Sequence, residues 1–134
     1  MKALKKVLIG VLSAPFVLVL LFVLFEIFGM IVNHTATCIQ TNTLRRDIRN
    51  AFPKTEIISV ESQTGNTSGT GNHVDCKTEI TFTSDLPLSV VQNKLSDRYE
   101  WNEWHCYVDE TDTAGEYLFY LRTPAPFPDN IEGH

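Results

Sequence analysis

The sequence lacks the residue patterns that mark the best-understood classes of enzyme. It contains no G-x-S-x-G turn, no H-E-x-x-H helix, no glycine-rich phosphate loop and no C-x-x-C pair. Each of these motifs places a nucleophile, a base or a set of ligands where a particular chemistry needs it. We therefore expect a protein that acts by binding, without catalysis, metal or cofactor.

Charged residues are missing from one long stretch of the chain. None occurs between Val7 and Phe25, and the apolar run continues to Val32 with Glu26 as its one charged residue. A helix needs about 20 mostly apolar residues to cross ~30 Å of hydrocarbon. Residues 7–32 therefore predict a transmembrane anchor held by membrane lipid. We expect Glu26 at the outer interface, or in contact with a partner inside the membrane.

Basic residues are unevenly placed around this anchor. Lys2, Lys5 and Lys6 precede it, and the next basic residue is Arg45. Because positive residues stay on the cytoplasmic side, we expect residues 1–6 in the cytoplasm and residues 33–134 outside the cytoplasmic membrane. A cleaved signal peptide is the alternative, but its apolar core is usually shorter and a small-residue cleavage site should follow it.

Cysteine is scarce, with three residues in the whole chain. In an oxidising compartment we expect a disulfide, and strand alternation places Cys76 and Cys106 on the core face. A bridge between them would stabilise the domain by about 2–4 kcal/mol. A pair that includes Cys38, or no bridge, is the alternative, and an unpaired Cys38 could link two chains into a homodimer. His73 and His105 point away from these cysteines, which argues against a zinc site.

The part outside the membrane is acidic. Residues 33–134 contain 8 Lys and Arg against 15 Asp and Glu, so nucleic acid is not expected as a partner. The cations Arg45, Arg46 and Arg49 occur early in this part. They predict either a membrane-proximal basic surface against lipid head groups or a solvated helix face.

Periodicity in residues 33–122 predicts an α+β domain. After a short connector at 33–40, we expect helices at 41–52 and 84–99. We expect strands at 55–62, 73–83, 101–109 and 116–122. The Pro-spaced tail, 123–134, is expected to be extended, because proline cannot join the centre of a sheet, and either to pack over an edge or to hang free.

The two halves of this domain share their spacing. Each half reads helix, strand, strand, and the apolar residues Leu44, Ile48 and Phe52 recur 47 residues later as Val91, Leu95 and Tyr99. Two such units packed side by side give a four-stranded antiparallel sheet with two helices on one face. The predicted fold is an αββαββ two-layer domain in the ferredoxin-like range.

This order of elements resembles the outer domains of inner-membrane platform proteins of type II secretion and type IV pilus machines. The resemblance lies in architecture, and it implies a role inside a membrane-bound assembly. The coiled coil that such proteins often carry after the anchor has no counterpart in this sequence.

Two features are candidates for recognition. The loop 63–72 is rich in small polar residues, including Gly65, Asn66, Gly69 and Gly71, and two tryptophans, Trp101 and Trp104, occur close together. We expect the domain to bind another envelope protein, as an accessory, inhibitor or immunity-type component, through its acidic surface, this loop or the open sheet face. The alternative is a module that binds or senses envelope material with the tryptophans or the loop.

Overall fold

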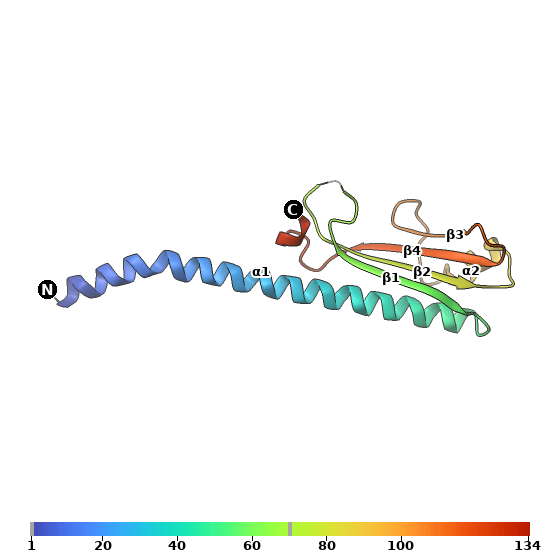
Figure 1. The fold of residues 1–134 in the computed structure, drawn as a ribbon, viewed down its shortest axis with the longest axis horizontal. Coiled ribbons are helices and arrows are strands. Elements are labelled where there is room, and N and C mark those ends of the chain that lie inside the picture. Colours follow the sequence, from blue (N-terminus) through green and yellow to red (C-terminus); the bar gives the residue numbers. More distant parts are fainter. Residues whose placement is uncertain (1, 70) are drawn as a thin grey trace.

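The computed structural model describes residues 2–69 and 71–134, with side chains from Gly10 onward (Figure 1). The lysine side chains of the predicted basic N-terminus lie outside the described residues. The elements in chain order are α1 (Lys2–Ala51), β1 (Ile57–Gly65), β2 (Asp75–Thr83), α2 (Leu88–Leu95), β3 (Cys106–Glu110), β4 (Glu116–Pro124) and the 3-10 helix η1 (Ile131–Gly133). The α+β class with two helices and four strands is confirmed.

Helix α1 is continuous, which corrects the prediction of a connector at 33–40. Its 50 residues span about 75 Å at 1.5 Å per residue. The connector holds no glycine or proline, and its threonines satisfy their hydroxyls inside the helix. Thr35 donates to the carbonyl of Ile31 at 2.7 Å, and Thr37 donates to that of Asn33 at 3.2 Å. The predicted anchor and the first domain helix therefore form one continuous helix.

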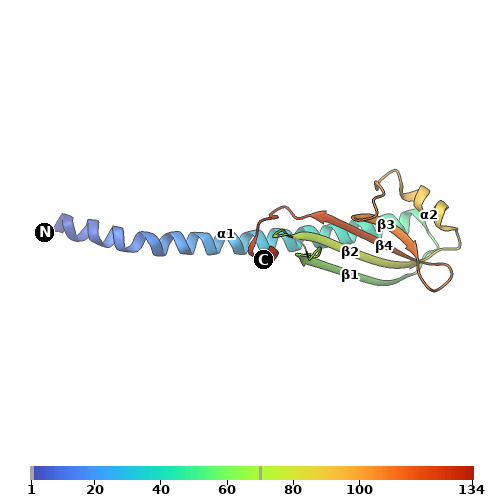
Figure 2. The ribbon, with the colours of Figure 1, turned by 90° about the horizontal axis from the view of Figure 1, so that it is seen from above.

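The first half of α1 stands clear of the rest of the chain (Figure 2). Within the described residues, α1 is the one helix long and apolar enough to cross a membrane. Its most apolar 18 residues have a mean hydropathy of 2.7, and 6% of them are buried. This exposed apolar surface is compatible with a single-pass anchor and with a signal sequence.

The sheet is antiparallel throughout, in the order β1-β2-β4-β3. One row of paired residues, Val60, Ile80, Phe119 and Val108, crosses all four strands and points into the core. Both helices pack on this face. The apolar stripes predicted for them are confirmed in the core cluster, which contains Leu44, Ile48, Phe52, Val91 and Leu95, with Tyr99 packed against it.

Strand β3 begins later than predicted because residues 102–105 form a tight loop. The amide of Asn102 donates to the carbonyl of Cys106 at 2.7 Å, and the amide of Cys106 donates back to Asn102 at 3.0 Å. The loop breaks the alternation of side chains. Cys106 and Val108 lie in the core as expected, whereas Trp104 is 72% exposed.

The C-terminal tail packs on the domain, which is one of the two arrangements expected for it. Pro124 ends β4, a central strand, beyond the last residue of β4 that pairs with β3, Leu121. The chain then pairs with the residue before β2: Ala125 donates to the carbonyl of Val74 at 3.0 Å, and Val74 donates to that of Pro128 at 2.7 Å. Proline is tolerated here because the neighbouring edge is empty among the described strands.

The predicted Cys76–Cys106 disulfide is wrong for this structure. All three cysteines, each within the described residues, are free. Cys76 lies on β2 and Cys106 on β3, and β4 separates these strands. Two strand spacings amount to about 10 Å, whereas a bridge needs Cα atoms within about 7 Å. Sequence alternation placed both thiols on one face but could not reveal the intervening strand.

Phe119 anchors the core, so we expect Phe119→Ala to lower the free energy of unfolding by about 3–5 kcal/mol. The ring is fully buried, with centroids 5.0 Å from Tyr99 and 5.6 Å from Trp101. Denaturant unfolding of the full chain in detergent, followed by tryptophan fluorescence, measures this loss. Ile58→Ala, at a half-exposed edge position, is the control. Equal losses for both variants would contradict this core.

Candidate functional site

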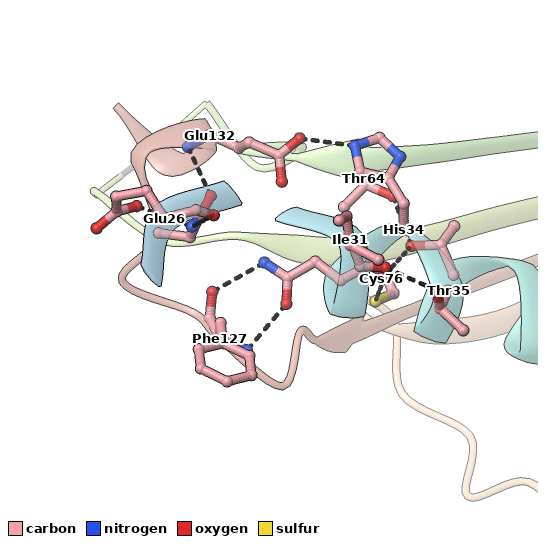
Figure 3. Close-up of polar contacts among 11 residues, drawn as sticks. Glu26, Ile31, His34, Thr35, Thr64, Cys76, Phe127 and Glu132 are labelled. Atoms are coloured by element: carbon pink, nitrogen blue, oxygen red, sulfur yellow. Dashed lines mark hydrogen bonds and ion pairs between the residues drawn. The ribbon is translucent and has the colours of Figure 1, made fainter. Parts of the chain in front are cut away.

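The C-terminal segment, residues 125–134, docks on α1 where the exposed apolar surface ends (Figure 3). Asn33 is 0% exposed and uses both ends of its amide on one residue of this segment. Its Nδ2 donates to the carbonyl of Phe127 at 3.0 Å, and its Oδ1 accepts from the amide of Phe127 at 2.9 Å. These two hydrogen bonds resemble those between paired β-strands, and they fix the position of the C-terminal segment along α1.

Glu26, the one charged residue in the predicted anchor, is bound by the same segment. Asn130 Nδ2 donates to the Glu26 carbonyl at 2.9 Å and to its carboxylate at 2.8 Å. The amide of Ile131 donates to the same carboxylate oxygen at 2.9 Å. Among the described residues, the C-terminal segment therefore supplies the hydrogen-bond partners of Glu26. This contact lies at the boundary of the apolar stretch.

Two glycines allow the close approach of these elements. A Cβ on Gly29 would lie 2.7 Å from Asn130 Nδ2, and one on Gly133 would lie 2.9 Å from the backbone of His73. Further along α1 than Gly29, His34 Nε2 lies 2.6 Å from a Glu132 carboxylate oxygen. The close packing at the two glycines and the His34–Glu132 pair therefore both hold the C-terminal segment in place.

The predicted recognition loop, 63–72, is tied to the C-terminal segment. Asn66 Nδ2 donates to the carbonyl of Gly71 at 2.7 Å and to that of Gly133 at 3.3 Å. Gly65 is buried at the end of β1, and it shares a positive φ with Gly69 and Gly71. Thr70 lies outside the described residues. The glycines serve turn geometry, and the loop forms one unit with η1.

The two tryptophans do not form a shared stacking site. Trp101 packs against the core, with its ring centroid 5.6 Å from that of Phe119. Trp104 projects from the tight loop before β3 and is exposed. Their closeness in the sequence did not reveal that the loop turns them in different directions.

The sheet face that points away from α1 and α2 carries a cluster of aromatic and charged side chains. The rings of Tyr107 and Tyr120 stack at 4.8 Å, with 10° between their planes. Lys77 Nζ lies 5.6 Å from the Tyr120 centroid and 3.0 Å from a Glu79 oxygen. We call these residues, with Arg122 and the exposed Trp104, the sheet-face patch.

Two side chains of this patch have raised pKa values, with opposite consequences for charge. The Glu79 hydrogen bond raises the pKa of Lys77, which favours its charged form, whereas burial raises the pKa of the Tyr107 hydroxyl, which favours its neutral form. Arg122 Nη2 donates to the carbonyl of Trp104 at 3.3 Å and lies 3.1 Å from His105 Nδ1. The neighbouring loop is thereby held beside β4.

Sequence reasoning named the open sheet face but missed its tyrosines. The stacking of Tyr107 on Tyr120 depends on the register of β3 against β4, which pairs these two residues. Alternation around the core residue Phe119 was the available signal, since it turns Tyr120 to the other face.

The arginines predicted near the membrane lie far along α1. At 1.5 Å per residue, Arg45 to Arg49 are about 20–26 Å beyond Val32. Arg46 is exposed. The buried carboxylate of Asp47 accepts from Arg98 and, at 2.9 Å, from the hydroxyl of Tyr99. The choice between a lipid contact and a solvated helix face stays a prediction for these arginines.

Two hollows flank the domain. One, of about 540 Å³, lies at the end remote from the apolar half of α1, and its lining includes Phe52, Lys54, Leu86 and Lys94. The other, of about 400 Å³, runs between α1 and β1 and contains the exposed thiol of Cys38. Among the described residues, no group of three or more His, Cys, Asp or Glu side chains is placed to hold a metal ion.

Comparisons with protein-family models, with curated proteins and with solved structures give no match. The function must therefore be argued from the geometry of this chain.

We expect Gly29→Ala to loosen the C-terminal segment. The added methyl displaces the Asn130 side chain and its hydrogen bonds to Glu26, at a cost of about 1–3 kcal/mol. The undocked population rises about tenfold for each 1.4 kcal/mol lost. Carboxypeptidase digestion of the full chain measures it as faster removal of the last residues. Gly10→Ala, where nothing lies within 4 Å, is the matched control and should digest like the parent.

Thiol labelling checks the cysteine assignment. Burial raises the pKa of the Cys106 thiol to about 11, so this thiol stays protonated at neutral pH. Cys76 is also buried, whereas Cys38 is exposed. We expect a maleimide to modify one thiol in the folded full chain and three after unfolding without reductant. Fewer than three after unfolding would reveal a disulfide.

Proposed function

We propose that this chain is a single-pass, membrane-anchored protein-binding module whose domain faces outside the cytoplasmic membrane. The anchor is supported by the uncovered apolar window in α1 and by the lysines that precede it. Within residues 7–32, the 19 charge-free residues Val7–Phe25 cross the hydrocarbon, and Glu26 lies at the outer interface. The docking of the C-terminal segment from Glu26 onward supports this boundary.

The observation that carries the binding role is the sheet-face patch. Protein interfaces are enriched in Tyr, Trp and Arg, and these residues dominate the energy of binding. The patch brings Tyr107, Tyr120 and Arg122 together on the face that α1 and α2 leave open, and Arg122 bonds the backbone of the loop that carries the exposed Trp104. Lys77 and Glu79 add charges of both signs, which favour a polar protein surface as the partner.

The attachment of the domain to α1 supports this role. Helix α1 passes from the proposed anchor into the core as one continuous helix, so the sheet packs on the same helix that would span the membrane (Figure 1). The strands run alongside α1, so the patch faces sideways above the membrane. A neighbouring envelope protein would meet it there, which suits an accessory, inhibitor or immunity-type component. The strand order with both helices on one face supports the ferredoxin-like topology.

The alternative, a module that binds envelope material, has weaker support. Its paired-tryptophan site is lost because Trp101 packs in the core, and its loop is held by the C-terminal segment. A homodimer through the exposed Cys38 stays a prediction.

Site-specific photo-crosslinking in cells tests the binding role. We expect a photoreactive residue at Trp104, in the exposed loop before β3, or at Thr81, on the open side of the sheet, to yield one heterologous protein adduct. The same residue at Asn50, on the exposed side of α1, is the matched control and should yield none. Tyr120→Ala should reduce the yield from Trp104 because it removes the stacked aromatic centre. Equal adducts from Asn50, or no adduct from either sheet position, would contradict the proposal.

A further inference from the structure

We propose that the C-terminal segment, residues 125–134, is a second membrane contact that places Phe127 and Ile131 in the interfacial layer beside the anchor. The inference rests on the proposed anchor in α1. The segment would lie against the lipid interface. Three independent features of the segment support this contact.

The first feature is continuity with the exposed apolar surface of α1. The Phe127 ring packs edge-on against Phe25 and Phe28, at 5.8 Å from each centroid. Those two rings remain more than half exposed, and Ile131, in the next turn of chain, is 56% exposed. Aromatic and apolar side chains gathered at the end of a membrane helix are typical of the interfacial belt.

The second feature is the satisfaction of backbone groups. Near hydrocarbon, each unpaired N–H or C=O is costly. The amides of Phe127 and Ile131 are bonded to α1, and the carbonyl of Pro128 accepts from Val74. Pro126 and Pro128 have no N–H to satisfy. The proline spacing thus removes donors from the segment that lies closest to the lipid.

The third feature is the partnering of the Glu26 carboxylate. By length, the 19 residues Val7–Phe25 cover about 28 Å, so Glu26 lies at the edge of the hydrocarbon. A carboxylate at this depth is costly unless its oxygens are bonded. Asn130 and Ile131 supply these bonds from the segment itself. The segment therefore has to lie at the same depth as Glu26.

The charge of the segment indicates the kind of lipid contact. Asp129 is exposed, and Glu132 is paired with His34. No Lys or Arg occurs in residues 125–134. Attraction to anionic head groups is therefore not the driving force, and insertion of apolar side chains is. The contact should form equally in neutral and anionic bilayers.

An environment-sensitive fluorophore tests the inference. In a Cys38→Ser background, Ile131→Cys is labelled with a nitrobenzoxadiazole dye in the full chain, reconstituted into phosphatidylcholine vesicles. We expect blue-shifted emission that is quenched by lipids spin-labelled near the head group. Asn50→Cys, further along the same helix, is the aqueous control and should show neither effect. Trp101 fluorescence checks that each variant is folded.

A second label separates this inference from the proposed anchor. Leu18→Cys, in the middle of the apolar stretch, should be quenched most by lipids spin-labelled deep in the acyl chains. If Leu18 is quenched while Ile131 behaves like Asn50, the anchor stands and the interfacial contact is overturned. If Leu18 is not quenched, the anchor itself fails. Quenching at Ile131 that needs anionic lipid would overturn the apolar mode of contact.

Discussion

The structure depends on helix α1, which is exposed and apolar in its first part and packs in the domain core in its last part. The apolar side chains from Val11 to Leu24 of α1 are exposed, whereas Leu44 and Ile48, near its C-terminal end, lie in the core. No break separates these two parts of the helix, and residues 33–40 between them contain no glycine or proline. Any tilt of the first half is therefore passed directly to the sheet.

The C-terminal segment completes this rigid arrangement. Helix and sheet meet through the core, and Thr37, Gln40 and Thr41 of α1 hydrogen-bond to β1, β2 and β4. Asn33 and Glu26 extend this contact towards the apolar half by binding Phe127, Asn130 and Ile131. The bonds to Phe127 and Asn130 are partly buried, so losing one partner would leave the other unsatisfied. We expect the segment to dock cooperatively rather than residue by residue.

Local patterns were sufficient for much of the fold. Apolar stripes predicted both domain helices, and alternation predicted β2 and the core positions of Ile80 and Phe82. The strand order was not predictable, and this is why the Cys76–Cys106 bridge was wrong. The tight loop at Asn102 depends on hydrogen bonds to Cys106, and the alternation of apolar and polar residues does not reveal such bonds.

The docking site was hidden from sequence reasoning for a different reason. Its hydrogen bonds join residues 94 to 105 positions apart, for instance Asn33 with Phe127 and Glu26 with Ile131. The proline spacing of the tail indicated an extended chain, which is partly true. Nothing local in that spacing indicated which element the chain would lie against.

Amide hydrogen exchange at Ile131, in the full chain reconstituted into lipid nanodiscs, is the most direct test of this account. Its N–H donates to the Glu26 carboxylate, so we predict exchange much slower than in an unstructured peptide, and faster exchange in Glu26→Ala. Exchange at the free-peptide rate in the parent protein, unchanged by Glu26→Ala, would contradict it. The tail would then be free, and the sheet would be held to α1 by the core and by the hydrogen bonds of Thr37, Gln40 and Thr41.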